Sequence, residues 1–289
     1  MSIIHIVILA IVQGFAELLP VSSSAHVVVT EKLLGLDPSS PPMTLLLVML
    51  HTGTMFAVIV YFWRQWRETY FRSFAAFKRI TWTVFVATMI TGIIGEALIK
   101  VIEKTILGNV PHAQIEDLFS HLEWIAPALV VAGVLILVAG LAGKGAAARA
   151  AAEPRDPDLK ESAWIGAVQG LCLPFRGFSR SGATISVGML LGIAKARAEA
   201  FSFALAVVLT PPVVVREAWR LLQMERADPA VDLSSIAGRC AFGALVAFLA
   251  GLLALRWLSS WLERGRWHLF GIYCLFAAAV VAYLYTAGF

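Results

Sequence analysis

Apolar residues run through the chain in long stretches that are separated by short polar segments. Six stretches are close to the roughly 20 residues needed to cross a hydrocarbon core of about 30 Å. They lie at 44–63, 81–103, 122–142, 200–222, 236–258 and 266–286. We therefore expect an all-α, polytopic membrane protein with six transmembrane helices.

Two further apolar segments, 3–27 and 163–194, are interrupted by Gln, Pro, Gly, Ser and Arg. Irregular backbone at membrane depth is tolerated only where protein or a water-filled cavity satisfies its polar groups. We therefore predict that both segments are re-entrant helix-loop-helix elements that line a site.

The composition agrees with a single membrane domain over residues 1–289. Of the 289 residues, 59% are hydrophobic and 15% are charged, and the mean hydropathy is +0.80. The net charge of +4 lies in short segments between apolar runs, so it does not indicate nucleic acid as a partner. Cys172, Cys240 and Cys274 lack the spacing of a zinc site or a disulfide framework, and we interpret them as packing residues.

The two interrupted segments resemble each other. A Val-Gln-Gly triplet occurs at 12–14 and again at 168–170, an offset of 156 residues. Each half then has one re-entrant element followed by three spans, with repeat 1 at about 1–142 and repeat 2 at about 163–289. Because an odd number of spans reverses the second copy, the pattern predicts an inverted repeat.

Charge sets the expected orientation. With this topology, segments 64–80, 143–162, 195–199 and 256–266 share one face and carry 14 Lys or Arg, against seven on the other face. By the positive-inside rule the first face is cytoplasmic. Both termini would then be periplasmic, with the first re-entrant element entering from the periplasm and the second from the cytoplasm.

The first interrupted segment carries a carboxylate motif. Gln13 and Glu17 are four residues apart, so a helix places them on one face. The sequence VSSSAH follows, with Ser22, Ser23 and His26 in a turn or at a new helix N-terminus. The serines could be simple helix caps, but an ionisable residue such as Glu17 inside an apolar segment indicates a functional site.

The second interrupted segment carries the pattern of a phosphate cradle. Glycines let successive backbone N–H groups converge on an anion, and arginine matches phosphate oxygens with its planar fork. The residues concerned are Arg176, Gly177, Ser179, Arg180, Ser181, Gly182 and Thr184. The competing interpretation is a cytoplasmic loop whose arginines follow the positive-inside rule.

Together the two motifs indicate chemistry on a bound phosphate group. We expect Ser22, Ser23, Ser179, Arg180, Ser181 and Thr184 to bind phosphate, with Gln13, Arg176, Gly177 and Gly182 in support. Glu17, His26, Arg180 and Ser181 are the candidate catalytic residues, and Glu17 is the candidate metal ligand. Hard oxygen ligands favour Mg²⁺ or Ca²⁺. The nucleophile is left open between His26, a serine and water.

The stretches QGFAELLPVSSSAH and GFSRSGATIS resemble the two signature regions of bacterial undecaprenyl-diphosphate phosphatases, the bacitracin resistance family. The resemblance extends over nearly the whole chain, including LHTGTMFAVIVYFW and FSFALAVVLTPP. It implies hydrolysis of undecaprenyl diphosphate to the monophosphate that carries cell-wall precursors. It also implies a divalent cation and a location in the bacterial inner membrane among membrane lipids. The orientation expected from charge would make the site accessible from the periplasm. A homodimer is retained as one arrangement.

The chain departs from that family's pattern at three positions. The family has Glu at both ends of a Glu-x-x-x-Glu motif, and this chain has Gln13 at the first of these positions and Glu17 at the second. Arg176 stands before Gly177, where Pro is usual. Gln169 is also one residue further from Ser179 than in the common pattern. The metal site would then have fewer carboxylates than in other members.

A transporter or lipid flippase is the main alternative, because inverted repeats and broken membrane segments are also transporter features. A transporter needs a phosphate cradle but no poised acid or base. Glu17 and His26 beside the cradle therefore favour hydrolysis.

Overall fold

The computed structural model of the chain describes residues 2–37, 40–105, 122–152, 154–227, 233–262 and 266–288. Over these residues it has ten helices and no strand. The helices are α1 (Ile3–Leu18), α2 (Ser23–Leu33), α3 (Pro41–Thr69), α4 (Phe74–Thr105), α5 (Leu122–Ala152), α6 (Leu159–Cys172), α7 (Arg180–Leu190), α8 (Lys195–Ala227), α9 (Leu233–Leu262) and α10 (His268–Thr286).

Six of these helices are long and apolar enough to cross a membrane, as predicted. Their candidate spans are Met43–Thr69, Phe74–Thr105, Leu122–Ala142, Lys195–Arg216, Ser234–Arg256 and His268–Thr286. The predicted boundaries were too short in places, since residues 64–69 and 74–80 belong to α3 and α4 and not to a connecting segment. Arg, Lys, Gln and Glu are good helix formers, so polar residues continue a helix past its apolar stretch.

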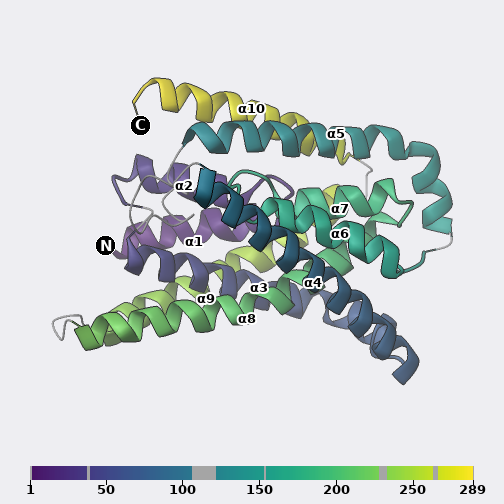
Figure 1. Cartoon of the computed structure of the whole chain (residues 1–289), viewed down its shortest axis with the longest axis horizontal. Helices are drawn as coiled ribbons and strands as arrows, with labels where there is room; N and C mark the ends of the chain where they lie inside the picture. The colour runs from purple at the N-terminus through teal and green to yellow at the C-terminus, as the bar shows by residue number, and fades with distance from the viewer. Residues whose placement is uncertain are drawn as a thin grey trace.

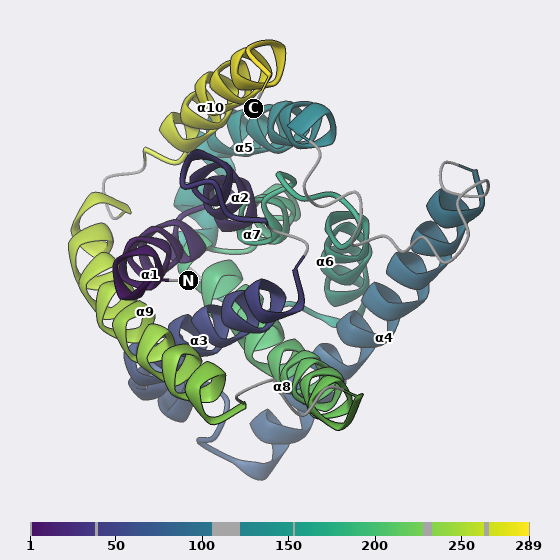
Figure 2. The ribbon, with the colours of Figure 1, turned by 90° about the vertical axis from the view of Figure 1, so that its left-hand side faces the viewer.

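The two interrupted segments form the four short helices. Segment 3–27 folds into α1 and the start of α2, and segment 163–194 contains most of α6 and all of α7. The α1–α2 pair and the α6–α7 pair lie towards opposite sides of the molecule in Figure 1. In the view of Figure 2 the six long helices surround α2 and α7. Any polar site between the short helices is therefore enclosed by protein.

The glycine of each Val-Gln-Gly triplet marks a close helix crossing. A Cβ atom on Gly14 would lie 2.5 Å from Ala250 Cβ and 3.0 Å from Ala247 O, on α9. A Cβ atom on Gly170 would lie 2.9 Å from Thr91 O, on α4. Small residues let helix backbones approach in membranes, where helix association depends on close packing. The repeated triplet thus fixes α1 on α9 and α6 on α4.

The long helices also expose apolar side chains on their outer faces. On α5, Val130, Val134 and Val138 recur every four residues and are 42%, 49% and 48% exposed. This spacing makes a single apolar stripe along the helix, as expected for a helix that faces lipid. The three cysteines are buried and free, in agreement with their interpretation as packing residues.

Part of the charge pattern behind the predicted orientation cannot be placed. Arg264 lies outside the described residues, as do the side chains of Lys144, Arg149, Arg220 and Arg226. The ends of the chain that are described, at α1 and α10, lie on the same side of the molecule in Figure 1.

The closest helix approach yields a test of the packing. A Cβ atom on Gly53 of α3 would lie 2.0 Å from Ala244 O of α9, whereas one on Gly92 of α4 would meet nothing within 4 Å. Gly53→Ala should therefore lower the free energy of unfolding by about 1–3 kcal/mol through overpacking. Gly92→Ala, the matched control, should leave it unchanged or raise it slightly. Unfolding in mixed detergent micelles measures both, and equal stability of the two variants would contradict the crossing.

Candidate functional site

The turns that follow α1 and α6 meet at a cavity of about 340 Å³. α2 begins at Ser23 and α7 begins at Arg180, so two helix N-termini open on the same space. Most of the predicted residues line it: Glu17, Ser22, Ser23, Arg176, Ser179, Arg180 and Ser181. The prediction that the two motifs share one pocket is confirmed.

The centre of the site is the carboxylate of Glu17, which lies near the end of α1 and has only 5% of its surface exposed. Its Oε1 atom forms an ion pair with Arg180 Nη2 across 163 residues of sequence. Its Oε2 atom accepts hydrogen bonds from Ser23 Oγ and, at 3.0 Å, from Gln13 Nε2. A buried charge needs such partners, and here they come from both halves of the chain.

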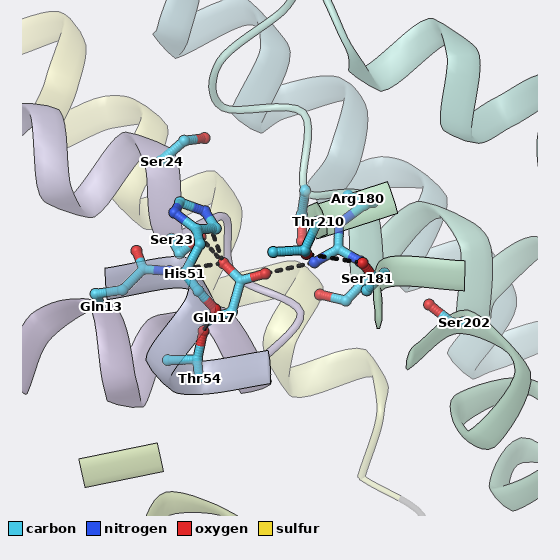
Figure 3. A network of polar contacts seen from close by, with 12 residues as sticks. Gln13, Glu17, Ser23, Ser24, His51, Thr54, Arg180, Ser181, Ser202 and Thr210 are labelled. Carbon is cyan, nitrogen blue, oxygen red and sulfur yellow. Dashed lines mark hydrogen bonds and ion pairs between the residues drawn. The ribbon is translucent and has the colours of Figure 1, made fainter. Parts of the chain in front are cut away.

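His51 completes the group around Glu17, and the sequence analysis did not single it out. This residue lies in the middle of α3, and its Nε2 atom is 3.3 Å from Glu17 Oε2 (Figure 3). Its Nδ1 atom lies 2.9 Å from the Leu47 carbonyl oxygen, which can only accept, so Nδ1 carries a proton. A hydrogen bond from His51 to Glu17 then requires a second proton between Nε2 and Oε2. The pair is therefore arranged to hold or pass one proton.

Backbone geometry shapes both turns. Ser22, just before α2, has φ 67° and ψ 87°, a left-handed conformation that is uncommon for a residue other than glycine. Gly177 has φ 102°, and a Cβ atom there would lie 2.6 Å from Ile125 O. The Gly177 N–H points to Ser24 Oγ at 3.4 Å, so the two turns also touch each other. Such conformations persist where the surrounding structure holds them, often at functional sites.

The start of α7 is suited to bind an anion. Ser179 caps the helix by accepting a hydrogen bond from Gly182 N at 3.2 Å. Arg180 uses Nη2 for Glu17, while its Nη1 atom is buried and has no hydrogen-bond partner among the described residues. A helix N-terminus, a guanidinium with one unpartnered nitrogen and the Ser22 hydroxyl are donors that a phosphate group accepts from, whereas the Ser181 hydroxyl already donates to the Leu19 carbonyl oxygen at 3.3 Å.

Some predicted residues lie behind the cavity instead of lining it. Thr184 Oγ1 lies 2.6 Å from Ser202 Oγ of α8 and joins α7 to that helix. A Cβ atom on Gly182 would lie 2.8 Å from Ile136, so this glycine serves the packing of α7 on α5. Gln13 is buried beside Glu17. These three positions support the site from outside its surface.

His26 also lies outside the lining. Its Nδ1 atom contacts the Ser22 carbonyl oxygen at 2.8 Å, and its Nε2 atom contacts the Tyr273 hydroxyl of α10 at 2.7 Å. Its ring stacks on that of Tyr273. The observed contacts of His26 hold the start of α2, and its predicted chemical role stays a prediction.

Glu17 and its neighbours do not form a cation cage by themselves. Both Glu17 oxygens already accept hydrogen bonds from protein donors. The described part of the chain contains no group of three or more His, Cys, Asp or Glu residues that could hold a metal ion. Mg²⁺ and Ca²⁺ take six or more oxygen ligands, which one engaged carboxylate and the buried Gln13 amide oxygen do not supply.

Fold and site together define a multi-pass membrane protein with a cavity inside its helical bundle that is lined by Glu17, Arg176 and Arg180. A family model described as "Bacitracin resistance protein BacA" matches residues 6–280, and the chain belongs to this family. It is therefore a multi-pass protein of the bacterial inner membrane.

Curated relatives agree over nearly the whole length. "Undecaprenyl-diphosphatase 2" of Acinetobacter baylyi is 54% identical over 284 residues, 97% of each chain. "Undecaprenyl-diphosphatase" of an Anaeromyxobacter species is 31% identical over 299 residues, covering all of this chain and 90% of the relative. "Undecaprenyl-diphosphatase 1" of Burkholderia pseudomallei is 32% identical over 288 residues, 96% and 95% of the two chains.

The ion pair at the centre of the site can be tested by a double-mutant cycle. Glu17→Gln or Arg180→Met alone leaves one charge buried without its partner, which should cost about 3–5 kcal/mol of stability. The double variant should lose less than the sum of the two, because neither charge remains. Unfolding in micelles measures the cycle.

The exposed pair Arg64–Glu68 on α3, with 3.0 Å between Nε and Oε1, is the matched control and should give a coupling near zero. Additive losses at Glu17 and Arg180 would contradict the observed pairing.

Proposed function

We propose that this chain is an undecaprenyl-diphosphatase, which hydrolyses undecaprenyl diphosphate to undecaprenyl phosphate and inorganic phosphate. The names of the curated relatives support this reaction. The observation that carries it is the buried Nη1 atom of Arg180, which has no hydrogen-bond partner within the described ranges and belongs to a residue that lines the cavity with Glu17 and Ser23. A donor for the phosphate and an acceptor for a proton thus meet in one cavity.

In the proposed reaction, Arg180 and the first amides of α2 and α7 bind the terminal phosphate and stabilise the charge that develops on it. Ser23 Oγ attacks the terminal phosphorus, and its proton passes to Glu17. The bond from that phosphorus to the bridging oxygen breaks, so undecaprenyl phosphate leaves. Water then attacks the phosphoserine, which releases inorganic phosphate and returns a proton to Ser23. Direct attack by water, with Glu17 as the base, uses the same residues.

His51 has the role of a proton partner for Glu17 in this scheme. Its Nε2 atom contacts the same Glu17 oxygen that accepts the Ser23 proton. With 38% of its side chain exposed to the cavity, it can relay a proton from Glu17 to water.

The rest of the cavity fits the other parts of the substrate. Arg176 lines it and bears the second positive charge, which suits the second phosphate of a diphosphate. Val48, Leu173 and Phe178 give an apolar wall on which the first isoprene units can pack.

We also propose that the two halves of the chain form an inverted repeat. Reciprocal packing supports an inverted repeat, since α1 of the first half packs on α9 of the second and α6 of the second packs on α4 of the first. The α5–α10 and α3–α8 pairs join equivalent helices. In this arrangement α1–α2 and α6–α7 are re-entrant, both termini are periplasmic and the substrate enters from the periplasm. We also propose that the protein forms a homodimer.

A divalent cation, Mg²⁺ or Ca²⁺, is proposed to arrive with the substrate, because the protein alone offers too few oxygen ligands. The phosphate oxygens of the diphosphate would supply most of its ligands. Excess EDTA should then lower phosphate release. Added Mg²⁺ or Ca²⁺ should restore it, and the extent of recovery should increase with the substrate concentration. Unchanged activity with the chelator would remove the cation from the proposal.

The reaction itself is tested by phosphate release from undecaprenyl diphosphate by purified protein. Glu17→Gln and Arg180→Lys should each reduce turnover by at least about 100-fold, because each removes a contact made to the reacting groups. His51→Gln retains a hydrogen-bonding side chain but cannot carry a proton, so it should also lower turnover.

Glu68→Gln makes the same chemical change on the exposed side of α3 and should keep parental turnover. Near-parental release by Glu17→Gln would refute the assignment. Parental protein that moves a polyprenyl phosphate across liposomes but releases no phosphate would favour the transporter alternative instead.

A further inference from the structure

A second cavity, of about 220 Å³, lies at the turn between α3 and α4. It is lined by the end of α3, the first turns of α4 and Asp156, which precedes α6. Thr69 lies 18 residues beyond His51 on the same helix, about 27 Å along its axis at 1.5 Å per residue. The second cavity is therefore at the opposite end of α3 from the first.

The charges around this cavity leave a positive excess. Asp156 is engaged on both oxygens: Arg79 Nη2 lies 2.9 Å from Oδ2, and Arg197 Nη1 lies 3.4 Å from Oδ1. Arg72 also lines the cavity and has no ion-pair partner within the described ranges. Two guanidinium groups, those of Arg72 and Arg79, therefore line the cavity with one carboxylate, and that carboxylate also pairs with Arg197 outside the lining; this balance suits an anionic ligand.

The cavity also offers hydroxyl and amide donors. Tyr70 lines it and is only 4% exposed, and its hydroxyl has no hydrogen-bond partner in the described part of the chain. Burial raises the pKa of the Tyr70 phenol, and the nearby Asp156 carboxylate adds to this, so the hydroxyl stays a donor. Ala75 and Ala76, in the first turn of the 32-residue helix α4, belong to the lining as well, and the Ala76 N–H already donates to Ser73 Oγ at 3.2 Å. The buried Tyr70 hydroxyl is therefore the group that calls for an acceptor such as a phosphate oxygen.

Exposed aromatic rings surround the same turn. Phe71 lies with its ring centroid 6.0 Å from that of Trp63 and 5.7 Å from that of Phe77. Phe74 is 82% exposed at the start of α4, which projects from the molecule at the lower right of Figure 1. Trp is enriched at the ends of membrane spans, at the depth of lipid headgroups, and Trp63 lies six residues before the end of the Met43–Thr69 span. A cavity that begins at Thr69 is therefore suited in position to a lipid phosphate.

We propose that the α3–α4 turn binds the phosphate of an anionic phospholipid headgroup, through Arg72, Arg79 and the Tyr70 hydroxyl. The surrounding aromatic rings pack on the glycerol and the upper acyl chain. This site is separate from the cavity at Glu17 and does not depend on the reaction proposed there. Positive-inside charge alone does not account for it, because an exposed arginine or lysine needs neither an enclosed cavity nor a buried hydroxyl.

Native mass spectrometry of the purified full chain with added phosphatidylglycerol tests the site. The parental protein should retain one phosphatidylglycerol more tightly than phosphatidylcholine. Tyr70→Phe removes only the hydroxyl and Arg72→Gln only a charge, and each should weaken phosphatidylglycerol binding about tenfold, the value of a hydrogen bond to a charged group. Melting temperatures without lipid, unchanged in both variants, verify that they are folded.

Lys78→Gln is the matched control, because Lys78 is exposed on α4 but does not line the cavity. It should bind phosphatidylglycerol like the parent. Parental affinity in both Tyr70→Phe and Arg72→Gln would overturn the proposal. Inorganic phosphate is the other ligand to test. If it binds alone, displaces the lipid and needs Arg72 to do so, the site binds a free phosphate ion and the lipid assignment is overturned.

Discussion

The ion pair between Glu17 and Arg180 is the contact on which the site depends. It joins two residues that are 163 positions apart, at the end of one short helix and the beginning of another. Burying either charge alone is unfavourable, so the structure must bring the α1–α2 and α6–α7 turns together at the same depth. The six long helices hold these two turns in a fixed relative position.

Glycine makes that register possible. Because Gly14 and Gly170 lack a Cβ atom, α1 and α6 lie directly against the backbones of α9 and α4. Glu17 lies on α1, four residues before the turn ends at Val21. The contact between Gly14 and α9 sets the direction of α1. The Val-Gln-Gly triplets thus position the two turns that follow them, one with the carboxylate of Glu17 and the other with the guanidinium of Arg180.

The sequence was sufficient for the number of long apolar helices and for the meeting of Glu17 with Arg180, because length, apolarity and the cost of buried charge are local properties. It was not sufficient for His51. That residue lies in an otherwise ordinary span, and only the rule that an ionisable residue in a span needs a partner would have indicated it. His26 was selected from its place beside the serines, but the left-handed backbone at Ser22 starts α2 in a direction that turns His26 towards Tyr273. A single φ angle of this kind has no reliable sequence signal when the residue is not glycine.

Arg180 divides its donors between an internal and an external acceptor, and this division explains how a buried pair can serve a substrate. A guanidinium that gave both Nη atoms to Glu17 would be satisfied and would need to be pulled from its partner before it could bind phosphate. Here Nη2 stays on the carboxylate, and Nη1 has no hydrogen-bond partner among the residues that the structure describes. The charge on Glu17 keeps Arg180 in place, and the same carboxylate accepts the Ser23 hydroxyl on its other oxygen. In the reaction that we propose, one carboxylate therefore orients both the donor for the phosphate and the hydroxyl that attacks it, which is the preorganisation that electrostatic catalysis requires.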